Sequence, residues 1–130
     1  MDIVVDYPPN YDSILAKFPS IKGLPVVFAY GDKLYSPTGA MISADLKVHE
    51  VTHMQQQGSD PEGWWKRYLA EPEFRLNQEI EAYRNQFRFY CRAFKDGNQQ
   101  MKTLIRLATD LSSPMYGSLI SHQDAMTLIR

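Results

Sequence analysis

The sequence predicts an α+β fold in which a small N-terminal antiparallel hairpin or sheet is followed by a series of helices. Two β-prone runs joined by a two-residue turn lie within the first 40 residues. Helix caps and helical periodicity take over from Ser43 onward. Because 130 residues suffice for one buried core and are too few for two, we expect a single domain over residues 1–130.

The strand-forming segments all precede Ser43. Gly31-Asp32 separates two β-prone runs and is typical of a two-residue hairpin turn. Asn10 is a suitable N-cap for a short helix that Pro19 stops. Ser36-Pro37-Thr38-Gly39 ends the hairpin, because proline and glycine both interrupt a ladder. The expected elements are a strand at 3–5, a helix at 11–18, and hairpin strands at 24–30 and 33–35.

Helical signals dominate the rest of the chain. Ser43 can cap a helix that Gly58 then ends in the left-handed conformation. Asp60-Pro61 supplies a cap and a first-turn proline for the next helix, and Pro72 opens the longest one. We expect helices at about 44–57, 61–70, 72–94 and 99–111, with short helical pieces after Ser113-Pro114 and after Ser121, where Asp124 resembles the partner in a capping box.

Composition argues against several classes of function. The net charge is −1 and no basic block is present, so we expect neither nucleic acid nor a membrane as a partner. The single Cys91 cannot form an internal disulfide. Residues 1–6 lack the basic and apolar regions of a signal peptide, so we expect a protein that is cytoplasmic or otherwise not exported by a cleaved leader. An oligomer is compatible with the sequence, which carries no signature of one.

One motif specifies chemistry, the stretch from His49 to His53. Two histidines four residues apart on a helix lie about 40° from each other around its axis, so both imidazoles can reach one ion. Glu50 lies about 100° from His49 and flanks that ion. This is the HExxH pattern, in which two imidazoles hold Zn²⁺ and the glutamate acts as general base on a water at the metal. We therefore expect one zinc ion per chain.

A catalytic zinc normally has three protein ligands, so a third residue is required. The extended pattern HExxHxxGxxH is absent, because Gln56 and Ser59 occupy its glycine and third histidine. The longest predicted helix offers Glu79 and Glu81, which lie about 60° and 140° from the line of its apolar residues. A carboxylate at the edge of a core needs a partner that offsets its desolvation, so Glu79 is the expected ligand. The apolar line consists of Leu76, Ile80, Tyr83, Phe87, Tyr90 and Phe94.

From His49 to His53, followed after a short helical segment by Glu79-Ile80-Glu81-Ala82-Tyr83, the chain resembles the gluzincin branch of the zinc metallopeptidases. Families with a Glu-x-x-Ala-Asp element use the first glutamate as ligand, and that position matches Glu79. The resemblance covers about residues 24–94 and implies a zincin-like core with a mostly antiparallel sheet, an active-site helix and a glutamate helix. Tyr83 stands where the pattern has aspartate, so another residue must supply the contact that orients a histidine.

Two further residues have a functional and a structural interpretation. Tyr83, one turn from Glu79, is a candidate catalytic residue that donates its hydroxyl to an oxyanion or to a ligand. Core packing is the alternative, since it lies on the apolar line. His122 could be a donor or a ligand, but a lone histidine near the C-terminus is more often structural or exposed.

Three further groups of side chains, two tryptophans, three glutamines and three arginines, also have structural interpretations. Adjacent helix positions cannot both face a core squarely, so we expect one of Trp64 and Trp65 to be buried and the other partly exposed. The glutamines at 55–57 either line a pocket or form a polar helix end before Gly58. The arginines at 84, 88 and 92 are most simply a solvated face.

The leading hypothesis is a zinc-dependent peptidase with His49, His53 and Glu79 as metal ligands and Glu50 as general base. Its substrate would be a peptide or a protein, held as an extended strand by segment 24–30 or 33–35, as the family resemblance implies. The alternatives are a catalytically silent zinc-binding interaction or assembly protein, and an interaction module without metal.

Overall fold

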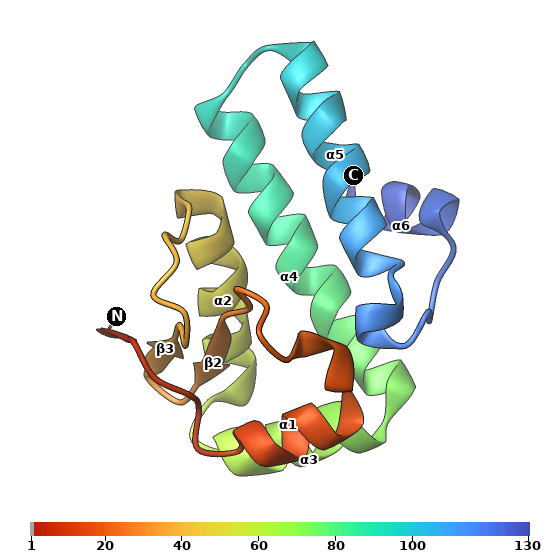
Figure 1. Ribbon diagram of the computed structural model, residues 1–130. Coiled ribbons are helices and arrows are strands. Elements are labelled where there is room, and N and C mark those ends of the chain that lie inside the picture. Colours follow the sequence, from red (N-terminus) through yellow and green to blue (C-terminus); the bar gives the residue numbers. More distant parts are fainter. Residues whose placement is uncertain (1) are drawn as a thin grey trace.

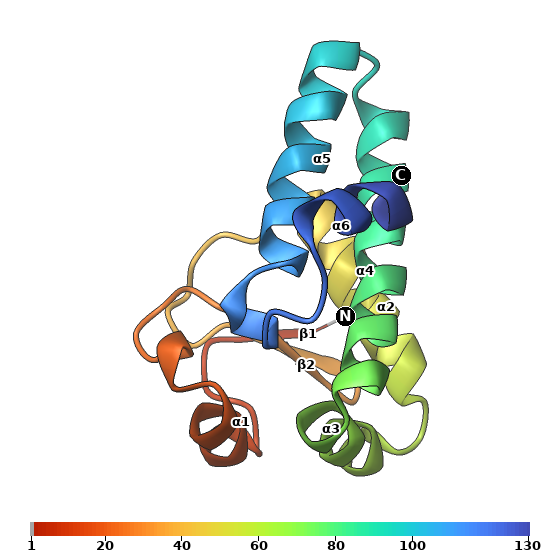
Figure 2. The same cartoon turned by 90° about the vertical axis from the view of Figure 1, so that its right-hand side faces the viewer.

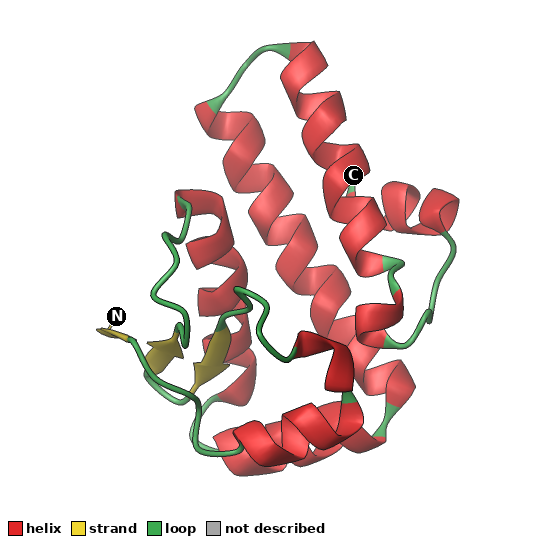
Figure 3. Cartoon of the chain, viewed as in Figure 1, coloured by secondary structure: helices red, strands yellow, loops and turns green. Residues whose placement is uncertain are grey.

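A computed structural model describes residues 2–130 and confirms the α+β class, with a small sheet and six α-helices in that part of the chain (Figure 1 and Figure 3). Met1, at the start of the segment considered as a leader, lies outside the described residues. The strands are β1 (Asp2–Val4), β2 (Phe28–Tyr30) and β3 (Lys33–Tyr35); the helices are α1 (Tyr11–Lys17), α2 (Ala44–Gln57), α3 (Pro61–Ala70), α4 (Pro72–Ala93), α5 (Gly97–Leu111) and α6 (His122–Ile129); and the 3₁₀ turns are η1 (Pro19–Ile21) and η2 (Pro114–Tyr116).

The sheet has the order β1-β3-β2, with β3 in the middle. β2 and β3 form the predicted antiparallel hairpin, in which Ala29 pairs with Leu34 and Gly31 adopts a φ of 64° at the turn. β1 runs parallel to β3, so only one of the two pairings is antiparallel, whereas the family resemblance implied a mostly antiparallel sheet. The predicted strand at 24–30 is shorter than expected, because its first four residues lie outside the ladder.

The helix boundaries largely follow the capping signals. Ser43 caps α2 by accepting a hydrogen bond from the Leu46 amide, and Gly58 ends the helix with a positive φ. Asp60 caps α3 in the same way. α5 begins at Gly97, two residues earlier than predicted, because Asp96 accepts from the Asn98 amide and acts as its N-cap. Within residues 2–130, no helix is both long and apolar enough to cross a membrane.

α4 is buried on two faces. Tyr83 and its apolar neighbours on the predicted line pack against α5 and α6, although the end of that line is exposed at Phe94. The most buried residues of α4 form a second line, about 90° from the first. That line faces α2 and is mainly polar; it consists of Arg75, Glu79, Ala82 and Gln86. Glu79 therefore lies inside the helix interface and not at the edge of the core.

Two apolar clusters flank this polar interface. One joins α4, α5 and α6, and the other joins α1, η1, β2 and α3. Figure 2 shows α5 and α6 toward one end of the molecule and α1 and α3 at the opposite end. The histidine-bearing helix α2 packs against α4 between them.

The prediction that one of Trp64 and Trp65 would be partly exposed is wrong, because both are buried, at 6% and 8% exposure. α3 is covered on two sides, so adjacent positions both find a protein neighbour. The Trp64 indole donates to Gln78 Oε1 on α4 at 2.8 Å, whereas the Trp65 indole donates to the Ala29 carbonyl on β2 at 3.0 Å. Neither ring forms an exposed aromatic platform.

Candidate metal centre

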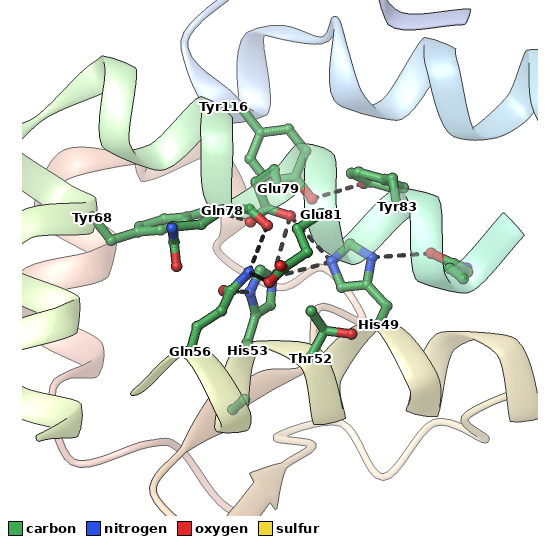
Figure 4. A network of polar contacts seen from close by, with 12 residues as sticks. His49, Thr52, His53, Gln56, Tyr68, Gln78, Glu79, Glu81, Tyr83 and Tyr116 are labelled. Carbon is green, nitrogen blue, oxygen red and sulfur yellow. Dashed lines mark hydrogen bonds and ion pairs between the residues drawn. The ribbon is translucent and has the colours of Figure 1, made fainter. Parts of the chain in front are cut away.

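α2 and α4 bring three potential ligands together (Figure 4). His49 Nε2 and His53 Nε2 are 3.2 Å apart, and Glu79 Oε1 lies 3.1 Å from the first and 3.2 Å from the second. His49, His53 and Glu79 are only 3%, 5% and 3% exposed. The structure thus places Glu79 beside the histidines. The alternative, Glu81, is exposed and does not belong to this group of potential ligands.

The spacing of these atoms fits a metal ion. Four ligands at about 2.0–2.1 Å in a tetrahedron are separated by about 3.3 Å from one another. The two imidazole nitrogens and the carboxylate oxygen are 3.1–3.2 Å from one another, which is close to the spacing of three corners of that tetrahedron. Three electron-pair donors held this close inside a protein repel one another unless a cation or a proton lies among them. The buried His-His-Glu group could therefore hold a metal ion.

The other ring nitrogen of each histidine contacts a glutamine. His49 Nδ1 lies 3.0 Å from Gln86 Oε1 on α4, and His53 Nδ1 lies 2.8 Å from Gln56 Oε1 on α2. Metal-binding histidines commonly use this second nitrogen to fix the ring orientation. The contact that orients His49 therefore comes from Gln86 and not from residue 83.

The three residues influence one another's protonation when no metal is bound. Burial lowers the pKa of His53, but the Glu79 carboxylate and further polar contacts outweigh burial and raise this pKa to about 9. Burial raises the pKa of Glu79, but the two histidines together hold this pKa far below its ordinary value. The carboxylate is therefore ionised, and a proton or a metal ion at His53 balances its charge.

Glu50 borders the same cavity as the three potential ligands. This cavity has a volume of about 70 Å³ and is lined by His49, Glu50, His53 and Glu79. Burial raises the pKa of the Glu50 carboxyl, which is 6% exposed. The remaining wall consists of aliphatic and aromatic side chains from α1, η1, residues 26–29, α3 and η2. A carboxyl group, a potential metal site and an apolar wall thus meet in one space.

Three tyrosines surround Glu79. The Tyr68 hydroxyl donates to Glu79 Oε2 at 2.5 Å, and Tyr68 and Tyr116 both line the cavity. The Tyr83 ring packs edge-on against His49, with 4.5 Å between centroids, while its hydroxyl is 2.8 Å from the Tyr116 hydroxyl. Burial and the Glu79 charge raise the pKa of all three hydroxyls, so they remain protonated donors. The catalytic role expected for Tyr83 stays a prediction, and Tyr68 and Tyr116 are better placed to face the cavity.

The proposed pairing of a substrate strand with the hairpin meets two obstacles. β3, at 33–35, is the central strand and is paired on both sides. β2 is an edge strand, but its Ala29 carbonyl already accepts hydrogen bonds from Gln57 Nε2 at 2.8 Å and from the Trp65 indole. Strand addition along 33–35 is therefore excluded, and along β2 it would have to displace these side chains.

The remaining predicted candidates lie away from the metal centre. His122 is exposed on α6 and its Nε2 is 3.4 Å from the Ile105 carbonyl, in agreement with a structural or exposed role. Gln57 is buried and ties the end of α2 to the hairpin through the Gly31 amide, whereas Gln55 is exposed. Of the arginines, Arg88 and Arg92 are exposed and Arg84 is half-buried.

Sequence reasoning missed Gln86 and Tyr68 as neighbours of the metal centre and left Gln56 with two interpretations, a pocket wall or a polar helix end. A signal existed for Gln86, which lies two turns after Glu79 and only about 20° from it around the helix axis. Gln56 lies one turn after His53, as a side-chain neighbour on a helix must. Tyr68 carries no comparable signal, because its contact with Glu79 depends on the angle between α3 and α4.

Comparisons with protein-family models, with curated proteins and with solved structures yield no match to this chain.

Proposed function

We propose that the buried His-His-Glu group binds zinc and that the protein is a zinc-dependent peptidase. The observation that carries this proposal is the convergence of His49, His53 and Glu79 in a cavity that Glu50 also lines. Two imidazoles and one carboxylate are a ligand set typical of catalytic zinc, which keeps one position open. Bound there, zinc would act as a Lewis acid that activates water and polarises a carbonyl group.

The residues around the cavity suit the remaining steps of peptide hydrolysis. Glu50 accepts a proton from the attacking water and delivers it to the leaving amine. The Tyr68 hydroxyl holds Glu79 in place by donating its one hydrogen to Oε2, and the Tyr116 hydroxyl at the cavity wall offers a hydrogen-bond donor. Gln86 and Gln56 keep both imidazoles oriented.

The cavity wall supports a preference for apolar substrates. Ile14, Ile21, Phe28 and Trp65 contribute buried apolar surface next to the polar group. An aliphatic or aromatic side chain beside the cleaved bond would gain from this environment, whereas a charged one would lose its hydration without compensation. We therefore expect a peptide or protein substrate with an apolar residue next to the scissile bond.

The zincin-like core is part of the same proposal. Strands that precede the HExxH helix, and a glutamate helix packed against it, support a reduced zincin-like arrangement. The third ligand 26 residues after His53 fits the gluzincin resemblance.

A second candidate function is a zinc-binding interaction or assembly protein without catalysis. The observation that favours it is burial, since the ligands and Glu50 are all at most 6% exposed. The cavity, with a volume of about 70 Å³, is also far smaller than the roughly 300–1,000 Å³ of typical ligand pockets. In this alternative the metal would join α2 to α4 and Glu50 would have no chemical task.

Metal content and hydrolysis distinguish these functions. We expect about one zinc per chain by elemental mass spectrometry, lost in Glu79→Ala and retained in the matched control Glu81→Ala. The parent should cleave members of a quenched fluorescent peptide library that have an apolar residue at the cleaved bond. Glu50→Gln should keep zinc and lose at least roughly 10²-fold in rate, because the general base is gone.

Three results would contradict the proposal, and each of them refutes a different part of it. Retained hydrolysis in Glu50→Gln would refute the assigned base. A zinc-loaded parent that cleaves no peptide of the library would favour the silent zinc protein. A parent that takes up no zinc at neutral pH would refute both functions.

A further inference from the structure

Each candidate ligand histidine is linked through a glutamine to a carboxylate outside the metal centre. Gln86 Oε1 faces His49 Nδ1 at 3.0 Å, and Gln86 Nε2 donates to Asp45 Oδ2 at 2.9 Å. Asp45 lies in the first turn of α2 and is itself 3.8 Å from Arg106 on α5. The chain of contacts therefore runs from α5 through Asp45 and Gln86 to His49.

The second link has the same order. Gln56 Oε1 faces His53 Nδ1 at 2.8 Å, while Gln56 Nε2 donates to Glu81 Oε1 at 2.8 Å and to the Gln78 carbonyl at 3.0 Å. Figure 4 shows Gln56 between His53 and Glu81. Both glutamines thus turn their oxygen toward a histidine and their NH₂ group toward acceptors.

The acceptors decide which way each amide points. An ionised carboxylate and a backbone carbonyl accept hydrogen bonds but cannot donate them. A reversed Gln86 would place its oxygen against the Asp45 carboxylate, with repulsion and without a hydrogen bond. Because the glutamine oxygen can only accept, the Nδ1 atom that it faces must carry a proton. The lone pair of each neutral imidazole then lies on Nε2, which points at Glu79.

We propose that Gln86 and Gln56 are positioning residues that hold both histidines in the Nδ1–H form, and that Asp45 and Glu81 orient these glutamines from outside the metal centre. The inference rests on the metal site of the proposed function but not on peptide hydrolysis. It assigns a task to a glutamine on α4 where the gluzincin pattern would use aspartate.

The two glutamines differ in how many acceptors orient their NH₂ groups. Gln56 has two acceptors for its NH₂ group, so the Gln78 carbonyl still orients it when Glu81 is absent. For Gln86, Asp45 is the one acceptor that the structure shows within residues 2–130. Asp45→Ala should therefore weaken zinc binding more than Glu81→Ala, although both remove a carboxylate that does not touch a histidine.

The tautomer can be measured without metal. Neutral histidine in water favours the Nε2–H form, so the protein must impose the other one. Long-range ¹H–¹⁵N NMR of the metal-free parent at mildly alkaline pH should show His49 with its proton on Nδ1. In Gln86→Met the Nε2–H form should become substantially populated. A His49 ring that is Nε2–H in the parent, or unchanged in the variant, would overturn the proposal.

Zinc affinity provides a second measurement, by competition with a chromophoric chelator. Loss of an outer partner of a metal-bound histidine typically costs about 10–100-fold in metal affinity, and we expect this for Gln86→Met. Gln55→Met is the control, because this glutamine on α2 is exposed and forms no hydrogen bond with a histidine among residues 2–130. In the Gln86→Met background, Asp45→Ala should have no further effect. A full additional loss there would show that Asp45 does not act through Gln86.

Exchanging the amide and the carboxylate between residues 86 and 45 tests whether Gln86 positions His49 or only stabilises the fold. Gln86→Glu alone places two carboxylates face to face and should weaken zinc binding. The double variant Asp45→Asn/Gln86→Glu restores a donor opposite an acceptor and keeps an oxygen toward His49 Nδ1, so affinity should recover. Absence of recovery would contradict the proposal. If the parent binds no zinc, the metal site of the proposed function fails, whereas the NMR measurement still decides the role of Gln86.

Discussion

Glu79 uses its two carboxylate oxygens for different contacts. Oε1 lies 3.1 Å and 3.2 Å from the two histidine Nε2 atoms, and Oε2 accepts a hydrogen bond from Tyr68. A buried carboxylate with an unpaired oxygen is costly, so the tyrosine both satisfies the group and fixes its rotamer. Glu79 can therefore present one oxygen to a metal without swinging away.

Tyr68→Phe tests this contact. The variant leaves Glu79 Oε2 without its donor, which should cost about 1–3 kcal/mol in free energy of unfolding. Zinc affinity should fall by about tenfold or more, because the ligand loses its orienting partner. Chemical denaturation and chelator competition measure the two effects. Tyr90→Phe, at a half-buried tyrosine on α4 far from Glu79, is the control that should change neither.

Helical phase was enough to select Glu79 over Glu81, because both residues lie on one helix whose axis orders them. The same reasoning could not find Tyr68, since it depends on how two helices cross. Tyr83 shows the converse case. Its position one turn from Glu79 suggested a donor, yet its hydroxyl lies against Tyr116.

At the scale of elements, α2 is fixed at both ends. Ser43 caps its first turn, and Gln57 in its last turn bonds the Gly31 amide and the Ala29 carbonyl of the hairpin. These contacts set the position of the histidine-bearing helix along the sheet.

Gln57→Met should loosen this attachment. The variant leaves the Gly31 amide without its side-chain acceptor, while the Ala29 carbonyl retains the Trp65 indole. We expect a loss of about 1–3 kcal/mol in free energy of unfolding, measured with urea. Gln55→Met, at an exposed position of the same helix, should stay within about 0.5 kcal/mol of the parent. Equal losses in both variants would contradict the role of Gln57.

Local sequence signals predicted the bounds of the helices better than they predicted which helix faces are buried. Ser43, Gly58 and Asp60 act within one turn of chain, so they marked the bounds of α2 and α3 correctly. The buried polar line of α4 was not predicted, because apolar periodicity detects only surface that is buried through its hydrophobicity. Gln86 and Arg75 are buried because hydrogen bonds satisfy them, and their partners Asp45 and Tyr116 are each 41 residues away in the sequence.

At the scale of the whole molecule, a polar layer separates the two apolar clusters. Tyr83 belongs to one cluster and packs on His49, while Trp64 and Tyr68 belong to the other and pack on His53. A metal ion held by α2 and α4 would therefore connect both halves of the core. The order of β-prone and helical segments predicted the α+β class, but the parallel pairing of β1 and the cover of the cavity by α1 and η2 arise from distant contacts.

Removal of zinc should lower thermal stability. A ligand at 100 times its dissociation constant stabilises the folded state by about 2.7 kcal/mol, which for a chain of this size corresponds to a shift in Tm of order 10 °C. Calorimetry with and without a chelator measures the shift. Glu79→Ala should show no response to the chelator, and an unresponsive parent would contradict the metal site.

The burial of Trp64 gives the protein an internal optical reporter. Its indole ring lies 5.3 Å from the His53 ring and 5.1 Å from Trp65, which makes both emitters sensitive to this region. A protonated imidazole quenches nearby indole fluorescence by accepting an excited electron, and loss of its proton relieves the quenching. A metal ion that displaces this proton should therefore increase the intrinsic tryptophan fluorescence. Metal binding could then be followed without an added dye.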